Sequence, residues 1–137
     1  MTVKEFLQKG RKLNFEIQSL KNARKEAYYL ATGITQDYSS EKVQTSKGNS
    51  SERKFIAYLE YSEKLDIKIT ELMEYRSKML ELINNLEDST YRTLLISRYI
   101  SCNTWERVAE DIEYSDVWVR TKLHSEALKE AAKYYSE

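Results

Sequence analysis

The chain has 137 residues, enough for one domain or for one small domain with an extension. It contains no proline and only three glycines, and 32% of its residues are charged, a composition typical of long amphipathic helices. Basic and acidic residues number 22 each, so the formal net charge is zero, which is unusual for a DNA-binding protein.

The cysteine count and the distribution of apolar residues indicate in which cellular compartment the protein is expected. A single cysteine, Cys102, excludes an intrachain disulfide and fits a reducing cytoplasm. No apolar run approaches the roughly 20 residues that span a bilayer. The N-terminus lacks the basic and then apolar segments of a signal peptide. We therefore expect a soluble cytoplasmic protein.

Residues 2–31 have the pattern of one amphipathic helix. Seven basic residues oppose three acidic ones in this segment, a net charge of +4. This charged side has two interpretations: a solvated helix face, which we favour, or a surface that contacts nucleic acid or an acidic partner. The apolar stripe consists of Val3, Phe6, Leu13, Ile17, Leu20 and Ala27.

Glycine and small polar residues interrupt the helical pattern from residue 32 to residue 51, which predicts a loop. Residues 51–87 then form a second, longer helix with a heptad repeat over roughly five heptads. Ser62 and Arg76 interrupt its seam. The helix must pack against the first helix as an antiparallel hairpin, against another copy of itself, or both. The two seam columns are Tyr58, Leu65, Leu72, Met79 and Leu86, and Phe55, Ser62, Ile69, Arg76 and Ile83.

A shorter helix is predicted over residues 90–100, with Asp88 at its start as a cap. Its inner face consists of Tyr91, Leu94, Leu95 and Tyr99. This helix would support the segment that follows it.

Residues 103–124 have the pattern of two short helices joined by a tight turn. Asn103 is a candidate N-cap, with Glu106 in the position of a capping box. Glu113 and Tyr114 make the turn, and Ser115 caps the second helix. The buried stripes are Val108, Ala109 and Ile112 in the first helix and Val119, Leu123 and Ala127 in the second. Trp105 is expected between the helices. This pattern is typical of a helix-turn-helix that reads DNA.

The start of the second helix supplies the candidate DNA-binding residues. Arg120 is suited to guanine, Thr121 to either base type, and Val117 to a thymine methyl group. The remaining candidates have other roles: Ser115 lies at the helix N-terminus, where free N–H groups suit a phosphate, and Lys122 and His124 are expected near the DNA backbone. Asp116 is included because it points away from the buried stripe. For Trp118, packing in the core or in an interface is favoured over contact with a base. The full set is Ser115, Asp116, Val117, Trp118, Arg120, Thr121, Lys122 and His124.

No constellation of catalytic residues is present. The chain has one histidine and one cysteine, no glycine-rich phosphate loop, and no cluster with the spacing of metal ligands. Cys102 is expected to be inert. We therefore expect no enzymatic activity, no cofactor and no metal.

The segments Leu94–Tyr99, Trp105–Ala109, Tyr114–Ser115 and Val119–Leu128 resemble region four of bacterial sigma factors. They resemble still more the C-terminal half of small phage regulators of the ArpU or RinA kind from Gram-positive hosts. The resemblance implies a phage transcriptional regulator in the host bacterial cytoplasm, with double-stranded DNA and host RNA polymerase as partners.

Together, these patterns predict an all-α protein with two parts. Residues 1–87 form a coiled-coil-like helical hairpin for oligomerisation or interaction, and residues 88–137 form a three-helix DNA-binding domain. The second part carries a net charge of −2, so a single copy should bind DNA weakly. We therefore expect a homodimer or higher oligomer, help from the basic first helix, or recruitment by polymerase. The alternatives are a DNA-packaging protein similar to a small terminase subunit, and a protein-binding helical adaptor.

Overall fold

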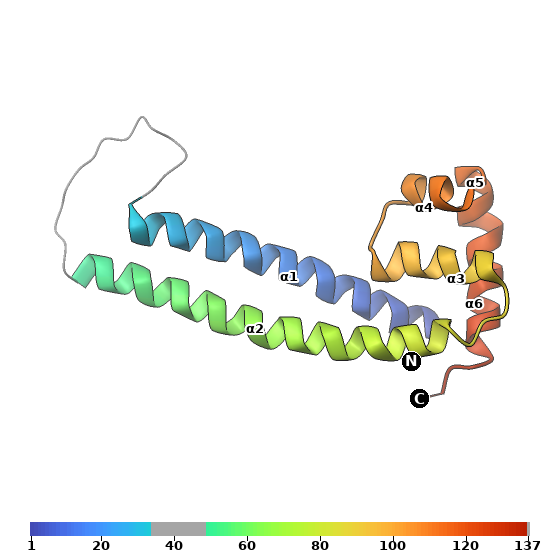
Figure 1. Cartoon of the computed structure of the whole chain (residues 1–137), viewed down its shortest axis with the longest axis horizontal. Coiled ribbons are helices and arrows are strands. Elements are labelled where there is room, and N and C mark those ends of the chain that lie inside the picture. The colour runs from blue at the N-terminus through green and yellow to red at the C-terminus, as the bar shows by residue number, and fades with distance from the viewer. Residues whose placement is uncertain (34–48, 137) are drawn as a thin grey trace. The chain divides into compact units, whose positions relative to one another are not determined.

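The computed structural model describes residues 1–33 and 49–136, whose regular secondary structure consists of helices without any strand, as the composition predicted (Figure 1). The fold is therefore all-α. None of the helices described is long and apolar enough to cross a membrane. Most of the predicted 32–51 loop, residues 34–48, lies outside the described residues.

Two compact units make up the chain, and their limits differ from the two predicted parts. The first unit is Met1–Asn14 with Glu71–Glu137, and the second is Phe15–Thr70. Helices α1 (Val3–Thr32) and α2 (Asn49–Ile83) each contribute to both units. The boundary predicted between residues 87 and 88 falls inside the first unit.

Helix α1 begins with a capping box, which was not among the features predicted from the sequence. The Thr2 hydroxyl accepts a hydrogen bond from the Glu5 amide at 3.1 Å, and the Glu5 carboxylate accepts one from the Thr2 amide at 2.7 Å. The buried residues of α1 are spaced by three or four positions or by sums of these steps. A helix has 3.6 residues per turn, so such positions lie on the same side of it. The buried residues are Val3, Leu7, Gly10, Leu13, Ile17 and Ala27. The predicted stripe missed Leu7, which is fully buried.

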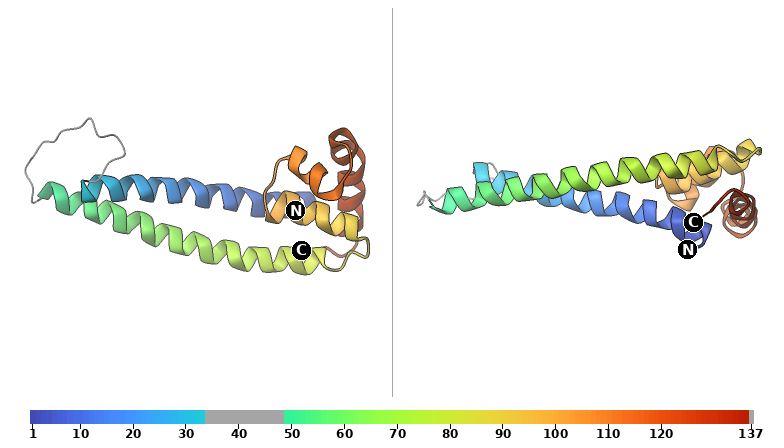
Figure 2. Two further views of the ribbon diagram at one scale, coloured as in Figure 1. Left: turned by 45° about the horizontal axis from the view of Figure 1, so that its top comes forward. Right: turned by 90° about the horizontal axis from the view of Figure 1, so that it is seen from below.

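The second unit pairs α1 with α2 in antiparallel directions (Figures 1 and 2). Lys68 and Glu16 form an ion pair at 3.4 Å, and the rings of Tyr28 and Tyr58 lie 5.7 Å apart. Phe55, predicted in the seam, is instead 54% exposed, stacked beside Tyr58. Within this unit the two helices therefore pair inside one chain.

Helix α2 ends at Ile83, before the predicted limit at residue 87. The chain turns there because Asp88 starts the next helix: its Oδ1 atom accepts from the amides of Thr90 and Tyr91 at 2.8 and 3.3 Å. This predicted cap is confirmed. Helix α3 (Ser89–Leu95) continues directly into η1 (Ile96–Ile100), a π-helical segment.

The remaining helices form the helix-turn-helix. Helix α4 (Trp105–Ile112) is followed by α5 (Asp116–Trp118), η2 (Val119–Leu123) and α6 (His124–Ala132). The last three have helical backbone angles across their junctions, so they form one continuous helix with a π-helical middle. We call this continuous helix, residues 116–132, the second helix of the helix-turn-helix.

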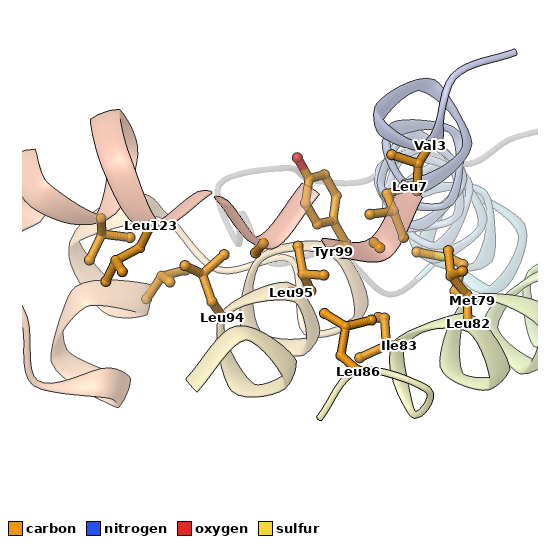
Figure 3. Close-up of a cluster of buried hydrophobic side chains, with 14 of the residues drawn as sticks. Val3, Leu7, Met79, Leu82, Ile83, Leu86, Leu94, Leu95, Tyr99 and Leu123 are labelled. Atoms are coloured by element: carbon orange, nitrogen blue, oxygen red, sulfur yellow. The ribbon is translucent and has the colours of Figure 1, made fainter. Parts of the chain in front are cut away.

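A single apolar core joins the ends of the long helices to the helix-turn-helix (Figure 3). Val3 and Leu7 of α1 and Met79 and Ile83 of α2 belong to the same cluster as Leu94 of α3. The cluster continues into the helix-turn-helix through Val108, Ala109, Val119, Leu123, Ala127 and Ala131. Residues 88–137 therefore do not have a core of their own.

Candidate DNA-binding helix-turn-helix

The turn between the two helices depends on Glu113, whose φ of 62° lies in the left-handed region. The Glu113 amide donates to the carbonyl of Glu110 at 3.3 Å, and the Tyr114 amide donates to that of Ala109 at 3.1 Å. This pair of bonds is a Schellman motif, which usually has glycine at the left-handed position. A side chain there costs roughly 1 kcal/mol.

Helix α4 begins one residue later than predicted. Thr104 is the N-cap, and its hydroxyl accepts from the Arg107 amide at 3.3 Å. Asn103 instead donates its side-chain amide to the Ser97 hydroxyl at 3.0 Å, so the predicted capping box with Glu106 was wrong. Cys102, with a φ of 60°, turns the chain before the cap.

Polar contacts fix α4 against η1. The buried Ser97 hydroxyl donates to Asp111 at 2.8 Å, and Arg107 pairs with the same carboxylate at 3.2 Å. The guanidinium of Arg98 lies 4.1 Å from the ring centroid of Trp105, a cation–π contact. These contacts hold the helix-turn-helix in one geometry.

The second helix starts at Ser115, as predicted, with the Ser115 hydroxyl accepting from the Trp118 amide at 3.2 Å. Its predicted buried stripe of Val119, Leu123 and Ala127 is confirmed. The opposite side therefore faces outward, and it carries most of the predicted site residues.

Those residues form one exposed face, and its charges are paired along the helix. Arg120 pairs with Asp116 at 3.1 Å, and Lys122 pairs with Glu126 at 3.6 Å. The Thr121 hydroxyl donates to the Val117 carbonyl at 2.6 Å. We call Ser115, Asp116, Val117, Trp118, Arg120, Thr121 and Lys122 the outer face; all are exposed except Asp116, which is half-buried.

His124 does not belong to the outer face, so its predicted position was wrong. It is 8% exposed, and its Nε2 atom lies 2.7 Å from the Tyr99 hydroxyl. The π-helical segment explains the error: the His124 amide bonds to the Val119 carbonyl five residues back, which aligns His124 with buried Val119. In an uninterrupted α-helix it would lie near Arg120.

The environment of His124 also opposes a phosphate contact. Burial, together with the smaller effect of the positive charges of Lys4 and Arg98, lowers the pKa of His124 from 6.5 to about 4. The imidazole is therefore neutral at pH 7. The Trp105 ring packs edge-on to it at 4.7 Å, and Trp105 itself is half-buried.

Three apolar side chains are exposed at the turn and at the start of the second helix, Tyr114, Val117 and Trp118, and we call them the apolar cluster. Trp118 is 46% exposed, so it does not pack in the core of the chain, and Val117 and Tyr114, which lie near it in the sequence, are exposed as well. Tyr114 was assigned only to the turn, because a single aromatic residue gives no periodic signal. Glu113 directly precedes Tyr114, and Asp116 directly precedes Val117.

No site for a metal is found: among the residues described, no three His, Cys, Asp or Glu side chains lie close enough to hold an ion. Burial raises the pKa of the Cys102 thiol, so the reactive thiolate is disfavoured. The absence of enzymatic activity stays a prediction.

The sequence model of one protein family, described as "Protein of unknown function (DUF1492)", matches residues 34–132. This match covers well over half of the chain. The chain belongs to the DUF1492 family. No curated protein and no solved structure matches it. The matched range of this DUF1492 protein includes the whole outer face. The resemblance to sigma region four and to ArpU or RinA regulators stays a prediction.

Proposed function

We propose that this protein is a phage transcriptional regulator that binds double-stranded DNA through the outer face. The observation that carries the proposal is the outward orientation of Val117, Arg120, Thr121 and Lys122 at the start of the second helix of a helix-turn-helix. In this motif, the start of that helix enters the major groove.

Four side chains of the outer face and the amides at its start have roles in DNA binding that their chemistry supports. Arg120 would bond to a guanine edge, Thr121 to either base type, and Val117 would contact a thymine methyl group. Lys122 would contact the phosphate backbone, as would the amides near Ser115 at the helix N-terminus. The ion pair of Arg120 with Asp116 is exposed, so releasing Arg120 to a base costs roughly 0.5 kcal/mol.

The neutral charge of the chain requires more than one contact region on the DNA. A homodimer on two half-sites would double the phosphate contacts, and RNA polymerase would supply further binding energy as a second partner. A cytoplasmic location agrees with both partners.

A binding assay with matched variants tests the proposal. Footprinting on the DNA around the protein's own gene cluster should identify a protected site, and fluorescence anisotropy should then compare Arg120→Ala and Lys122→Ala with the wild type. Arg120→Ala should weaken specific binding by at least tenfold, whereas Lys122→Ala should weaken binding to all sequences.

Lys133→Ala is the control, because Lys133 forms a similar ion pair with Glu130 at 3.1 Å just beyond the far end of the second helix. Binding that is equally strong in all three variants would contradict the assignment of the outer face.

A second candidate function is a protein-binding adaptor, and the apolar cluster favours it. Tyr114, Val117 and Trp118 are exposed, with Glu113 and Asp116 next to them in the sequence, an arrangement that also suits a basic protein surface. A wild-type protein that shows no salt-sensitive DNA binding would replace the DNA-binding proposal with this one.

A further inference from the structure

Three arginines from three different helical segments come together in the first unit. The Nε atom of Arg11 in α1 donates to the carbonyl oxygen of Arg98 in η1 at 3.3 Å. Arg76 in α2 donates from Nη2 to the carbonyl of Ile100 at 2.8 Å, and Arg98 donates from Nη1 to the carbonyl of Asn103 at 3.0 Å. The three guanidinium groups therefore lie around the segment that leads from η1 into α4.

The hydrogen-bond partners of Arg76 and Arg98 are neutral. Arg76 also donates to the side-chain oxygen of Asn14 at 3.1 Å, but neither Arg76 nor Arg98 forms an ion pair with any described residue. The Nε atom of Arg76 is buried without a hydrogen-bond partner. Glu106 raises the pKa of Arg98, but its effect is the smallest of those that act on this group.

The three positive charges also repel one another. The pKa of Arg98 is lowered, first by its burial and second by the charge of Arg11. Arg76 and Arg98 are half-buried cations with neutral hydrogen-bond partners, which is unfavourable unless an anion comes near them. Guanidinium groups bind phosphate oxygens with paired N–H donors, so a phosphate is the anion that this cluster fits best.

We propose that Arg11, Arg76 and Arg98 form a binding site for one phosphate of the DNA backbone. This proposal rests on the proposed function. A polymer is favoured over free phosphate because α1 extends the positive charge: residues 1–14 carry four basic side chains and one acidic one. The site would supply the positive charge that the helix-turn-helix lacks. It lies next to the segment that leads from η1 into α4.

Arg11→Gln is the test variant, and Lys129→Gln is its control. Both remove one positive charge, but Lys129 lies on α6 and belongs neither to the cluster nor to the outer face. Arg11→Lys keeps the charge and loses the paired donors. Circular dichroism and urea unfolding would first establish that each variant is folded.

Fluorescence anisotropy with a labelled mixed-sequence duplex, at several salt concentrations, gives the main result. Arg11→Gln should weaken binding about tenfold near 0.1 M salt and lower the slope of log K against log[salt] by about one. Arg11→Lys should lie between the wild type and Arg11→Gln. If the wild type binds DNA and Arg11→Gln matches Lys129→Gln, the phosphate site is wrong while the proposed function stands.

Thermal unfolding is then measured in inorganic phosphate and in chloride at equal ionic strength. This comparison separates a failure of the phosphate site from a failure of the proposed function. If the wild type binds no DNA but phosphate raises its Tm more than that of Arg11→Gln, the cluster binds free phosphate only and its assignment to DNA is overturned. If phosphate raises the Tm of all variants equally and no DNA binds, both proposals fail.

Discussion

The hydroxyl of Tyr99 lies 2.7 Å from the Nε2 atom of His124, and both side chains are buried. Tyr99 belongs to the π-helical segment η1, and His124 directly follows the π-helical segment η2. The contact therefore joins the helix that precedes the helix-turn-helix to the middle of its second helix. It also explains why the only histidine in the chain is unavailable to DNA.

This burial predicts that folding stability decreases in mild acid. The pKa of His124 is about 4 in the folded protein and about 6.5 in the unfolded chain. Between these values the unfolded chain binds the extra proton, so stability is full above pH 6.5 and is lost as the pH falls towards 4. Urea unfolding should show a loss of about 2 kcal/mol between pH 7.5 and pH 5.

His124→Gln isolates this effect, because glutamine can still bond to the Tyr99 hydroxyl and does not titrate. We expect the variant to lose much less stability over the same pH range. The same pH dependence in both proteins would assign the effect to other groups.

The left-handed conformation of Glu113 predicts that glycine stabilises the turn. Glu113→Gly should raise the free energy of unfolding by about 1 kcal/mol, because glycine has no Cβ to oppose a φ of 62°. Glu110→Gly, within α4, should instead lower it by about 1 kcal/mol. Chemical denaturation measures both, and a loss of stability in Glu113→Gly would show that its side chain has a role that the turn geometry does not require.

Gly10 allows α1 to approach α2 closely, and a methyl group there should be unfavourable. A Cβ at this position would lie 2.8 Å from Met79 Cε, and closer still to the Met79 sulfur. Gly10→Ala gains about 1 kcal/mol in helix propensity but loses roughly 1–3 kcal/mol to overpacking, so we expect a net loss of about 1 kcal/mol.

The same substitution in a Met79→Ala background should be stabilising, since the space is then free. Urea unfolding of the four proteins in this double-mutant cycle would measure the coupling. A coupling near zero would contradict the close contact.

The ion pair of Asp116 with Arg120 predicts a gain of function by mutation. Asp116→Asn frees Arg120 and removes a negative charge from the outer face, so DNA affinity should rise by roughly three- to tenfold. The variant should lose about 0.5 kcal/mol of stability, because an acidic residue at a helix N-terminus is favourable. Anisotropy measures the affinity, with Glu130→Gln as the control; weaker DNA binding by Asp116→Asn would mean that the carboxylate itself contributes a contact.

Many features of this protein could be predicted from local sequence. The caps at Asp88 and Ser115 and the buried stripe of Val119 and Leu123 are confirmed, because caps and helical stripes depend on residues within three or four positions of one another. The all-α class follows from the same local preferences.

Features that depend on distant residues were decided only by the tertiary structure. The core places Val3 and Met79 in one cluster with Val119, so the long helices and the helix-turn-helix share buried residues. The π-helical turn moves His124 to the buried side, which a regular 3.6-residue period does not predict. Arg11, Arg76 and Arg98 are far apart in the sequence, and they form one charged cluster because packing between helices, rather than spacing along a helix, brings them together.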